Sequence, residues 1–412
     1  MDDLLRCGGL LAALTAPVAR KTSGVGDDSE MDQNKRLAVG LMSGTSTDGI
    51  DAAVVEVKPG GEPASTLVAS IFRPFSPDER QCLLEAAQPN TAALQVKRAD
   101  IRLGEWLGDA VQGLLDEARL AAGDIRVIGS HGHTVAHYPE QGISWQIGNP
   151  HVLAEKTGIA VVTDFRQRDV TLGGQGAPLV PYYDYVMFHS RSESRVLLNL
   201  GGISNLTVLQ PSTSIDSVTA WDAGPANMIL DGLMMAASRN LAVMDEGGRQ
   251  MAQGEVNRRL LQQWLRHPYF EKAAPKSTGR EEFGQTYVQT LWEDGVAANA
   301  SLPDILATAG ELIAVTIGRS LERVTKGPVA LIAAGGGTHN RALMAKIAGQ
   351  LNLARPWQTT GEYGIPEDIK EAMAFAYFGW QFTENIPINI PQVTGARRAQ
   401  IMGTFTPAGG AV

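Results

Sequence analysis

The sequence predicts an α/β protein with two duplicated domains and a cleft between the copies. Two stretches, Leu37–Val57 and Val196–Leu209, each contain an apolar run, a small polar turn and a second apolar run, which is typical of a β-hairpin. A helical stripe from Leu103 to Ala118 leads into the apolar run Ile125–Ser130. The repeated hairpin indicates the duplication, and a helix that feeds a parallel strand indicates the fold class.

Length and composition exclude several classes of protein. The chain has 412 residues, more than one domain usually holds, and 44% of them are hydrophobic, so a substantial core can be buried. A net charge of -9 argues against non-specific nucleic-acid binding and gives no attraction to an anionic membrane. No apolar run approaches the roughly 18 residues of a membrane span. With two cysteines, Cys7 and Cys82, a disulfide framework is not expected, and we predict a cytoplasmic protein.

Residues 1–35 differ in composition from the rest of the chain. A short apolar stretch is followed by a polar one, and Asp2 and Asp3 outweigh Arg6, whereas a signal peptide begins with positive charge. We therefore expect a disordered extension, or a misassigned start with Met31 as the true first residue.

The turn of the first hairpin consists of small and polar residues. Such side chains leave backbone N–H groups open to an anion and add hydroxyl donors, although an ordinary Gly/Ser-rich hairpin has the same composition. The residues predicted to bind cofactor phosphates here are Ser43, Gly44, Thr45, Ser46, Thr47, Asp48 and Gly49.

The second hairpin repeats this composition, which favours phosphate binding over an ordinary turn. Its predicted binding residues are Asn199, Gly201, Gly202, Ser204 and Asn205. A third cluster, Gly335, Gly336 and Gly337, lies between a predicted strand, Val329–Ala334, and a predicted helix, Asn340–Leu351. Three glycines at a strand end let a flat ring lie against bare backbone, so the three clusters together predict ATP.

The strand Ile125–Ser130 runs into closely spaced histidines. His131, His133 and His137 could hold a metal, but no carboxylate or cysteine nearby completes a closed site. Strand ends at the carboxyl edge of an α/β sheet line the ligand crevice, so we favour His131 as a substrate-binding residue.

The next segment combines a short helix with a charged strand end. Asn149, Pro150 and Gly158 delimit the helix, and the predicted strand Ile159–Thr163 leads into DFRQRD. Within that motif, Arg168 could clamp a substrate carboxylate, whereas the alternative is a surface ion-pair cluster.

Two further stretches carry acids and cations at predicted strand ends or loops. Asp222, the first residue of DAGPAN, is expected to end a strand, where it could act as a general base or cap the following helix, and the residues alone do not decide between these roles. The loop Pro275–Glu281 could bind phosphate or be a solvated turn.

The C-terminal third contains two predicted helices, Ala307–Val324 and Glu371–Phe382. The aromatic residues of the second helix are expected in the core. Glu371 starts that helix, where an acid also interacts favourably with the helix dipole. The tail from Ile386 to Val412 is expected to return across the first domain.

These motifs resemble the actin, Hsp70 and sugar-kinase superfamily, and within it the anhydro-N-acetylmuramic acid kinases. The resemblance extends from about Leu37 to Thr404 and is carried by GLMSGTSTDGID, GSHGHT, QIGNP, DFRQRD, NLGGISN, DAGPAN, PKSTGRE, GGGTHN, EYGIP and VTGA. It implies two ribonuclease H-like (actin-like ATPase) domains: 36–164, completed by about 386–412, and 165–385.

The resemblance also implies an activity and several residue roles. Asp222 would take a proton from a water that opens the 1,6-anhydro ring, and the freed 6-oxygen would receive the γ-phosphoryl group of ATP. The residues it places near the sugar are His131, Arg168, Gly224, Asn227 and Glu371. Mg²⁺ would bridge the phosphates, with Asp48 and Asp51 as ligands through water.

The resemblance further suggests a homodimer, and rival functions remain open. A kinase of 1,6-anhydroglucose would share the nucleotide motifs, a plain hexose kinase would phosphorylate an existing hydroxyl, and an actin-like or chaperone-like ATPase would bind a protein instead of a sugar. Dependence of ADP release on the sugar distinguishes these functions.

Overall fold

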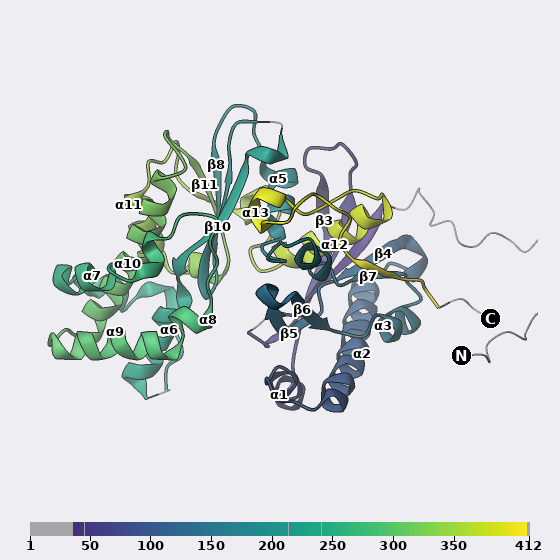
Figure 1. Cartoon of the computed structure of the whole chain (residues 1–412), viewed down its shortest axis with the longest axis horizontal. Coiled ribbons are helices and arrows are strands. Elements are labelled where there is room, and N and C mark those ends of the chain that lie inside the picture. The colour runs from purple at the N-terminus through teal and green to yellow at the C-terminus, as the bar shows by residue number, and fades with distance from the viewer. Residues whose placement is uncertain (1–35, 45, 213, 240, 410–412) are drawn as a thin grey trace, which may run out of the picture. The chain divides into compact units, whose positions relative to one another are not determined.

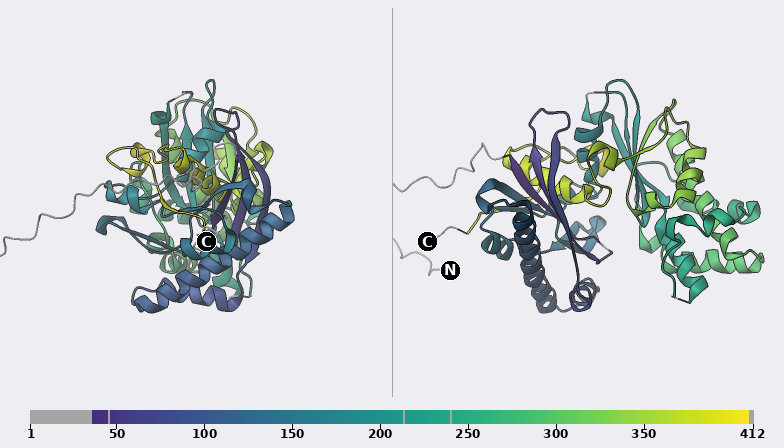
Figure 2. Two further views of the ribbon diagram at one scale, coloured as in Figure 1. Left: turned by 90° about the vertical axis from the view of Figure 1, so that its right-hand side faces the viewer. Right: turned by 180° about the vertical axis from the view of Figure 1, so that it is seen from behind.

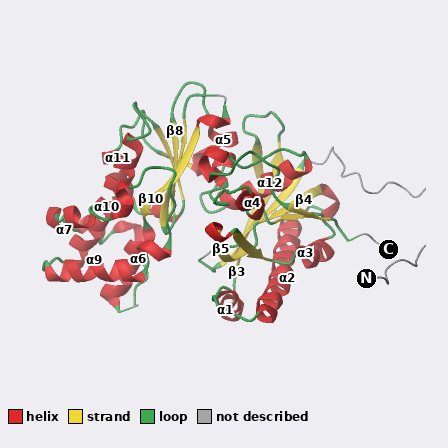
Figure 3. Ribbon diagram, in the orientation of Figure 1, coloured by secondary structure: helices red, strands yellow, loops and turns green. Residues whose placement is uncertain are grey.

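The structure is a computed structural model that describes residues 36–409 apart from 45, 213 and 240. The predicted extension 1–35 and Thr45 of the first turn lie outside the described residues. The described strands form two mixed sheets and a separate hairpin of β5 (His133–Tyr138) and β6 (Ile143–Ile147) (Figures 1 and 3). Within the described ranges, no helix combines the length and apolar character needed to cross a bilayer.

The first sheet has the strand order β13-β7-β4-β1-β2-β3. Its strands β1, β2 and β3 form an antiparallel meander, β4 and β7 run parallel to β1, and β13 pairs antiparallel with β7. The predicted first hairpin is thereby confirmed, and the C-terminal tail reaches the edge of this sheet. The bounds are β1 (Leu37–Met42), β2 (Gly49–Val57), β3 (Ser65–Pro74), β4 (Ile125–Ser130), β7 (Val161–Thr163) and β13 (Thr404–Thr406).

The second sheet has the order β10-β9-β8-β11-β12. Its first three strands again form an antiparallel meander, and the next two are parallel to the first strand of the meander. Both sheets therefore share the order third, second, first, fourth, fifth for these strands. The bounds are β8 (Arg195–Leu200), β9 (Ile203–Leu209), β10 (Val218–Pro225), β11 (Ala330–Ala334) and β12 (Gln358–Thr359).

Helices cover both faces of the first sheet (Figure 2). The long helix α2 (Ala93–Ala118) buries the predicted stripe, including Leu103, Leu107 and Val111, against one face. The opposite face is covered by α12 (Lys370–Thr383). The shorter helices near the first sheet are α1 (Pro77–Ala86), α3 (Pro150–Thr157) and α4 (Gln167–Thr171), whereas α13 (Pro391–Thr394) contacts β10 of the second sheet.

The two ends of helix α3 are determined by the residues at its boundaries. The Asn149 side chain accepts hydrogen bonds from the N–H groups of His151 and Val152, and Gly158 ends the helix with a left-handed backbone. The predicted boundaries of this helix are confirmed.

The second sheet is also covered on both faces. A large core contains side chains of α6 (Asn227–Ser238), α9 (Gln285–Ala297) and α10 (Leu302–Glu322) on one face. On the other face, α5 (Val180–Phe188) joins a core that includes side chains of both sheets. The other helices here are α7 (Arg258–Trp264), α8 (Arg280–Phe283) and α11 (Arg341–Gln350).

Helix α12 lies directly on the backbone of the first sheet because glycines leave room for it. A Cβ atom at Gly40 of β1 would stand 1.8 Å from the carbonyl oxygen of Ala372, and one at Gly129 of β4 would stand 1.9 Å from that of Phe375. The predicted second domain, 165–385, includes α12, but α12 packs on the first sheet. The predicted boundary at 385 therefore does not follow the packing of this helix.

Candidate active site

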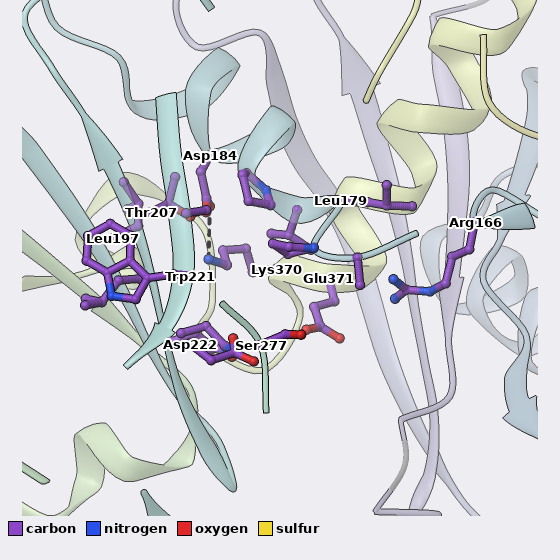
Figure 4. Close-up of a pocket in the computed structure, with 18 residues that line it drawn as sticks. Arg166, Leu179, Asp184, Leu197, Thr207, Trp221, Asp222, Ser277, Lys370 and Glu371 are labelled. Atoms are coloured by element: carbon purple, nitrogen blue, oxygen red, sulfur yellow. Dashed lines mark hydrogen bonds and ion pairs between the residues drawn. The ribbon is translucent and has the colours of Figure 1, made fainter. Parts of the chain in front are cut away.

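A cavity of ≈ 200 Å³ lies at the N-terminal end of α12 and reaches the strands of the second sheet (Figure 4). Its walls combine an apolar segment from Ala177 to Pro181 with a set of charged and amide side chains. Those polar residues are Arg166, Asp184, Asn199, Asn205, Thr207, Asp222, Ser277, Lys370 and Glu371. A concave, partly apolar site with a few convergent polar groups is the usual form of a small-molecule site.

Asp222 is held in this cavity by donors from two neighbouring segments. The Asn205 amide, directly opposite on β9, donates to Oδ1, and the Thr278 N–H donates to Oδ2 at 2.9 Å. The Asp222 N–H donates to the Lys276 carbonyl at 3.0 Å, so the loop Pro275–Glu281 lies against β10 and supports this residue. The carboxylate is thus fixed in orientation on both oxygens.

The alternative role of Asp222 as a helix cap is wrong. The strand β10 continues to Pro225, past the predicted end at Asp222, with a register shift between Asp222 and Gly224. Helix α6 is preceded by Ala226, and no side chain caps it. The carboxylate therefore lines the cavity and does not cap the helix.

The pKa of Asp222 is raised from 3.8 to about 6, chiefly by burial and to a lesser degree by the charge of nearby Glu281. The hydrogen bonds from Thr278 and Asn205 oppose this rise because they stabilise the charged form. A carboxylate with this pKa is ionised at neutral pH and more basic than an exposed aspartate, which suits general-base catalysis.

If Asp222 is the general base, kcat/KM of the catalysed reaction should fall at acid pH as Asp222 becomes protonated. This falling part of the pH profile is the acid limb. A general base must be unprotonated, so kcat/KM is expected to fall about tenfold per pH unit below about pH 6. In Asn205→Ala the carboxylate loses a donor, its pKa rises, and the limb moves to higher pH. Rate profiles of both proteins between pH 4.5 and 8.5, at roughly half-unit steps, measure this; an unmoved limb in the variant would show that Asp222 does not set it.

Glu371 and Arg166 face the same cavity from the side of the first sheet. Glu371 lies in the first turn of α12, and Figure 4 shows the Arg166 guanidinium directed toward it. Arg166 donates through Nη1 to the Gly176 carbonyl at 2.8 Å and through Nε to His131 Nε2 at 2.9 Å. These bonds hold a cation beside the cavity.

His131 supports Arg166 and does not line the cavity. It is buried against Phe375, and burial followed by the charge of Arg166 lowers the pKa of His131 well below 6.5. Its Nδ1 lies 3.0 Å from the Gly132 carbonyl, so the neutral ring donates there and accepts from Arg166. Among the described residues, no group of three or more His, Cys, Asp or Glu could hold a metal, which removes the histidine-cluster alternative for them.

The structure brings Arg166 to the cavity and leaves Arg168 outside it. Arg168 is exposed and donates to the Ile401 carbonyl at 2.9 Å. Both arginines belong to the motif DFRQRD, and nothing in the local sequence distinguishes them. The direction of each side chain depends on how α4 packs.

The first turn is tight and polar, as the sequence predicts. Thr47 has a left-handed backbone and donates its N–H to the Gly44 carbonyl at 3.1 Å, and the Ser46 hydroxyl donates to Asp48 at 2.8 Å. Ser43 is buried, with Oγ 3.2 Å from His133 Nδ1. Of the residues described in this turn, none lines the cavity.

Electrostatics connects the first hairpin with α12. The pKa of Asp51 is raised to about 7, chiefly by burial and then by the charges of Asp48, Glu371 and Asp368. Charges affect a pKa in this way only when they are close, so the carboxylates at the start of β2 and at the start of α12 must lie near each other. Together they create a region of negative potential. Gly49, where β2 begins, allows close packing, because a Cβ there would stand 2.5 Å from the Arg73 carbonyl oxygen.

The second turn and the glycine cluster lie against each other. The turn itself is Gly201 and Gly202, while Asn199, Ser204 and Asn205 belong to the flanking strands. A Cβ at Gly335 would stand 2.7 Å from Asn199 Oδ1, and one at Gly337 would stand 2.6 Å from Leu200 Cβ. Gly336 is exposed with open space around it, so bare backbone is available beside this hairpin.

Asn227 connects α6 to the second turn, and Ser204 connects β9 to Gly224 of β10. The Asn227 amide donates to the Leu200 carbonyl at 3.1 Å, and its N–H donates to the Gly201 carbonyl at 3.0 Å. The Ser204 hydroxyl donates to the Gly224 carbonyl at 2.9 Å. These bonds shape the second turn, and of these residues none lines the described cavity.

Three residues of the cavity, Lys370, Asp184 and Thr207, were not predicted from the sequence. Lys370 Nζ lies 3.0 Å from Asp184 Oδ1, and the Thr207 hydroxyl donates to Asp184 Oδ2 at 2.9 Å. A signal was present only for Asp184, an isolated charge within the apolar run of α5, because Lys370 stands beside Asp368 and Glu371 in the sequence. Isolated charges of this kind are buried only when they are paired.

Comparison with known proteins gives one consistent result. A family model described as anhydro-N-acetylmuramic acid kinase matches residues 36–408. Curated relatives with that name include one from Caldanaerobacter subterraneus subsp. tengcongensis, 38% identical over 91% of this chain and 98% of the relative. Another, from Pseudomonas paraeruginosa, is 40% identical over 90% of this chain and 98% of the relative. A ROK hexokinase structure from Thermus thermophilus aligns with 84% of this chain and 99% of its own at 14% identity and a TM-score of 0.35, too distant a likeness to add to this result.

Proposed function

We propose, from the premise that the chain belongs to the anhydro-N-acetylmuramic acid kinase family, that it phosphorylates 1,6-anhydro-N-acetylmuramic acid with ATP. The product is N-acetylmuramic acid 6-phosphate, and the role is the recycling of cell-wall sugar. The observation that carries this proposal for the present chain is Asp222, a partly buried carboxylate oriented by two donors in a cavity shared with Glu371 and Arg166.

In the proposed reaction Asp222 accepts a proton from a water molecule. The water oxygen bonds to the anomeric carbon, the bond from that carbon to O6 breaks, and O6 takes the γ-phosphoryl group as the bond to the β-phosphate oxygen breaks. ADP leaves, and the proton stays on Asp222 until solvent removes it. A general base with a pKa near 6 typically contributes about 10²- to 10⁴-fold to such a step.

The sugar is proposed to bind between Asp222 and the start of α12. Glu371 can accept hydrogen bonds from hydroxyl groups, and Arg166 is the arginine placed to hold an anionic group at this cavity. The predicted contact of Arg168 with a lactyl carboxylate finds no support in its exposed position. His131 acts through Arg166 in this proposal.

The nucleotide is proposed to bind along the two turns and the glycine cluster. The exposed backbone at Gly336 suits the adenine ring, and the polar first turn suits phosphate oxygens. The shared strand order of the two sheets supports a duplicated, ribonuclease H-like fold. Its first copy would include α12 in addition to 36–164 and the C-terminal tail. A homodimer in the cytoplasm remains part of this proposal.

Mg²⁺ fits the acids at the start of β2. After burial, the carboxylates of Asp48, Glu371 and Asp368 also raise the pKa of Asp51, so negative charge gathers here that a divalent cation would relieve. Because no described group of three ligands could hold the ion directly, Asp48 and Asp51 would act through water. When bound, Mg²⁺ neutralises charge that develops on the transferring phosphoryl group.

A coupled ADP assay tests the proposal. We expect ADP release only with 1,6-anhydro-N-acetylmuramic acid among that sugar, 1,6-anhydroglucose and glucose, and a product mass that shows addition of both water and a phosphoryl group. Release with 1,6-anhydroglucose alone would indicate the related anhydroglucose kinase. Slow ATP hydrolysis indifferent to all three sugars would indicate a protein-binding ATPase and would end the proposal.

A further inference from the structure

A buried ion pair connects the start of α12 to the second sheet. The side chains of Lys370 and Asp184 are 6% and 4% exposed, and their charged atoms lie 3.0 Å apart (Figure 4). The second oxygen of Asp184 accepts the Thr207 hydroxyl of β9 at 2.9 Å. Both carboxylate oxygens are therefore used, and the pair has little contact with water.

This ion pair is connected both to Glu371, which is proposed to bind the sugar, and to Asp222, which is proposed to act as the base. Lys370 precedes Glu371 in the first turn of α12. On β9, Thr207 and Asn205 are two residues apart, so their side chains lie on the same face of the strand. Asn205 in turn donates to Asp222. A continuous path of bonds thus extends from Glu371 to Asp222.

We propose that Lys370, Asp184 and Thr207 form a positioning element that sets the placement of Glu371 relative to Asp222. The inference rests on the proposed role of Asp222 as the base. The rest of α12 packs on the first sheet through Gly40 and Gly129, whereas Asp222 belongs to the second sheet. Separating the pair would leave two buried charges unpaired, so the joined arrangement is strongly favoured.

Two other roles for Lys370 make different predictions. If it acted directly on Asp222 by its charge, its loss would move the acid limb of the rate profile. The cation that lowers the pKa of Asp222 is Lys276, which favours an effect through position. If Lys370 only stabilised the fold, its loss would lower the melting temperature and leave kcat of the folded protein unchanged.

The test compares Lys370→Met with Arg126→Met, using sugar-dependent ADP release by the full chain. Arg126 is also buried and pairs with Glu384 at the other end of α12, remote in sequence from Glu371, so it is a matched control for loss of an ion pair on the same helix. We expect Lys370→Met to lower kcat about 10- to 100-fold, because small misplacements of reacting groups have effects of this size.

The remaining measurements distinguish a positioning role of Lys370 from a direct effect of its charge and from an effect on stability alone. In Lys370→Met the KM for ATP should change less than about threefold and the acid limb should stay in place, and Lys370→Arg should recover most of kcat. Arg126→Met, assayed below its melting temperature, should keep kcat within about twofold of wild type. An unchanged kcat in Lys370→Met, a shifted limb, or an equal loss in Arg126→Met would each overturn the inference.

A milder variant keeps the test decisive if Lys370→Met does not fold. Thr207→Val removes only the hydroxyl that binds Asp184, and it should lower kcat about three- to tenfold without a change in the KM for ATP. Full activity of this variant would contradict the proposed element. Failure of the proposed function is a separate result, because the wild-type protein itself would then release no ADP with the anhydro sugar.

Discussion

Asp222→Asn is expected to lower kcat by about 10²- to 10⁴-fold and to leave the dissociation constant of ATP within about threefold of wild type. The amide is nearly isosteric with the carboxylate but cannot accept the proton of the attacking water. The Asn205 amide can turn so that its oxygen accepts from the new side chain, while the Thr278 N–H still donates to the remaining oxygen. Steady-state ADP release and calorimetric titration with ATP measure the two effects.

Asp231→Asn is the matched control for this variant. Asp231 lies on α6, does not line the described cavity, and has a pKa that burial raises from 3.8 to about 6, as for Asp222. Its replacement should leave kcat unchanged. Turnover near wild type in Asp222→Asn, or an equal loss in Asp231→Asn, would remove Asp222 from the proposed role.

Both replacements should also raise the stability of the fold at neutral pH. For an acid with a raised pKa, the folded state binds the proton more tightly than the unfolded state, so the ionised group destabilises the fold above about pH 6. Removing it should raise the free energy of unfolding by about 1–3 kcal/mol at pH 7.5. The gain should shrink as the pH falls below about 6 and should vanish only well below 3.8, where both states are protonated, and thermal unfolding measured across this pH range tests it.

Gly40→Ala is expected to destabilise the protein by about 3 kcal/mol or more. The new Cβ would stand 1.8 Å from the Ala372 carbonyl oxygen, a backbone atom that cannot rotate away, so α12 must move off β1. Since α12 carries Lys370 and Glu371, the folded fraction should also turn over slowly. Urea unfolding measures the first effect, and kcat normalised to folded protein measures the second.

Gly349→Ala provides the control for Gly40→Ala. Gly349 is an exposed residue of α11 with open space where a Cβ would be, so alanine there should be neutral or stabilise by up to about 1 kcal/mol. Wild-type stability in Gly40→Ala would mean that the first sheet and α12 do not pack as closely as described.

Features that depend on neighbouring residues were predicted well from the sequence. The two hairpins, the strand Ile125–Ser130 and helix α3 follow from apolar periodicity, turn residues and capping residues, all of which act over a few positions. The contact between the glycine cluster and the second hairpin follows from parallel strands ending at one edge of a sheet.

Side-chain direction was predicted less well. Arg166 and Arg168 have the same chemistry and differ by two positions, yet Arg166 alone lines the described cavity. His131 has the residue type and strand-end position of a ligand-binding group, but its ring accepts a hydrogen bond from Arg166 and packs against Phe375. Each outcome depends on residues far away in the chain.

The sequence by itself determined the α/β fold class, the pair of polar hairpins, the glycine cluster and Asp222 as a candidate acid of the site, because these are properties of short segments. Only the tertiary structure decided that α12 packs on the first sheet, that Arg166 reaches the cavity, and that Lys370 meets Asp184. The physical reason is that the role of a buried charge or of a bare glycine surface depends on the group packed against it. That group comes from a segment distant in the sequence and is brought there by folding.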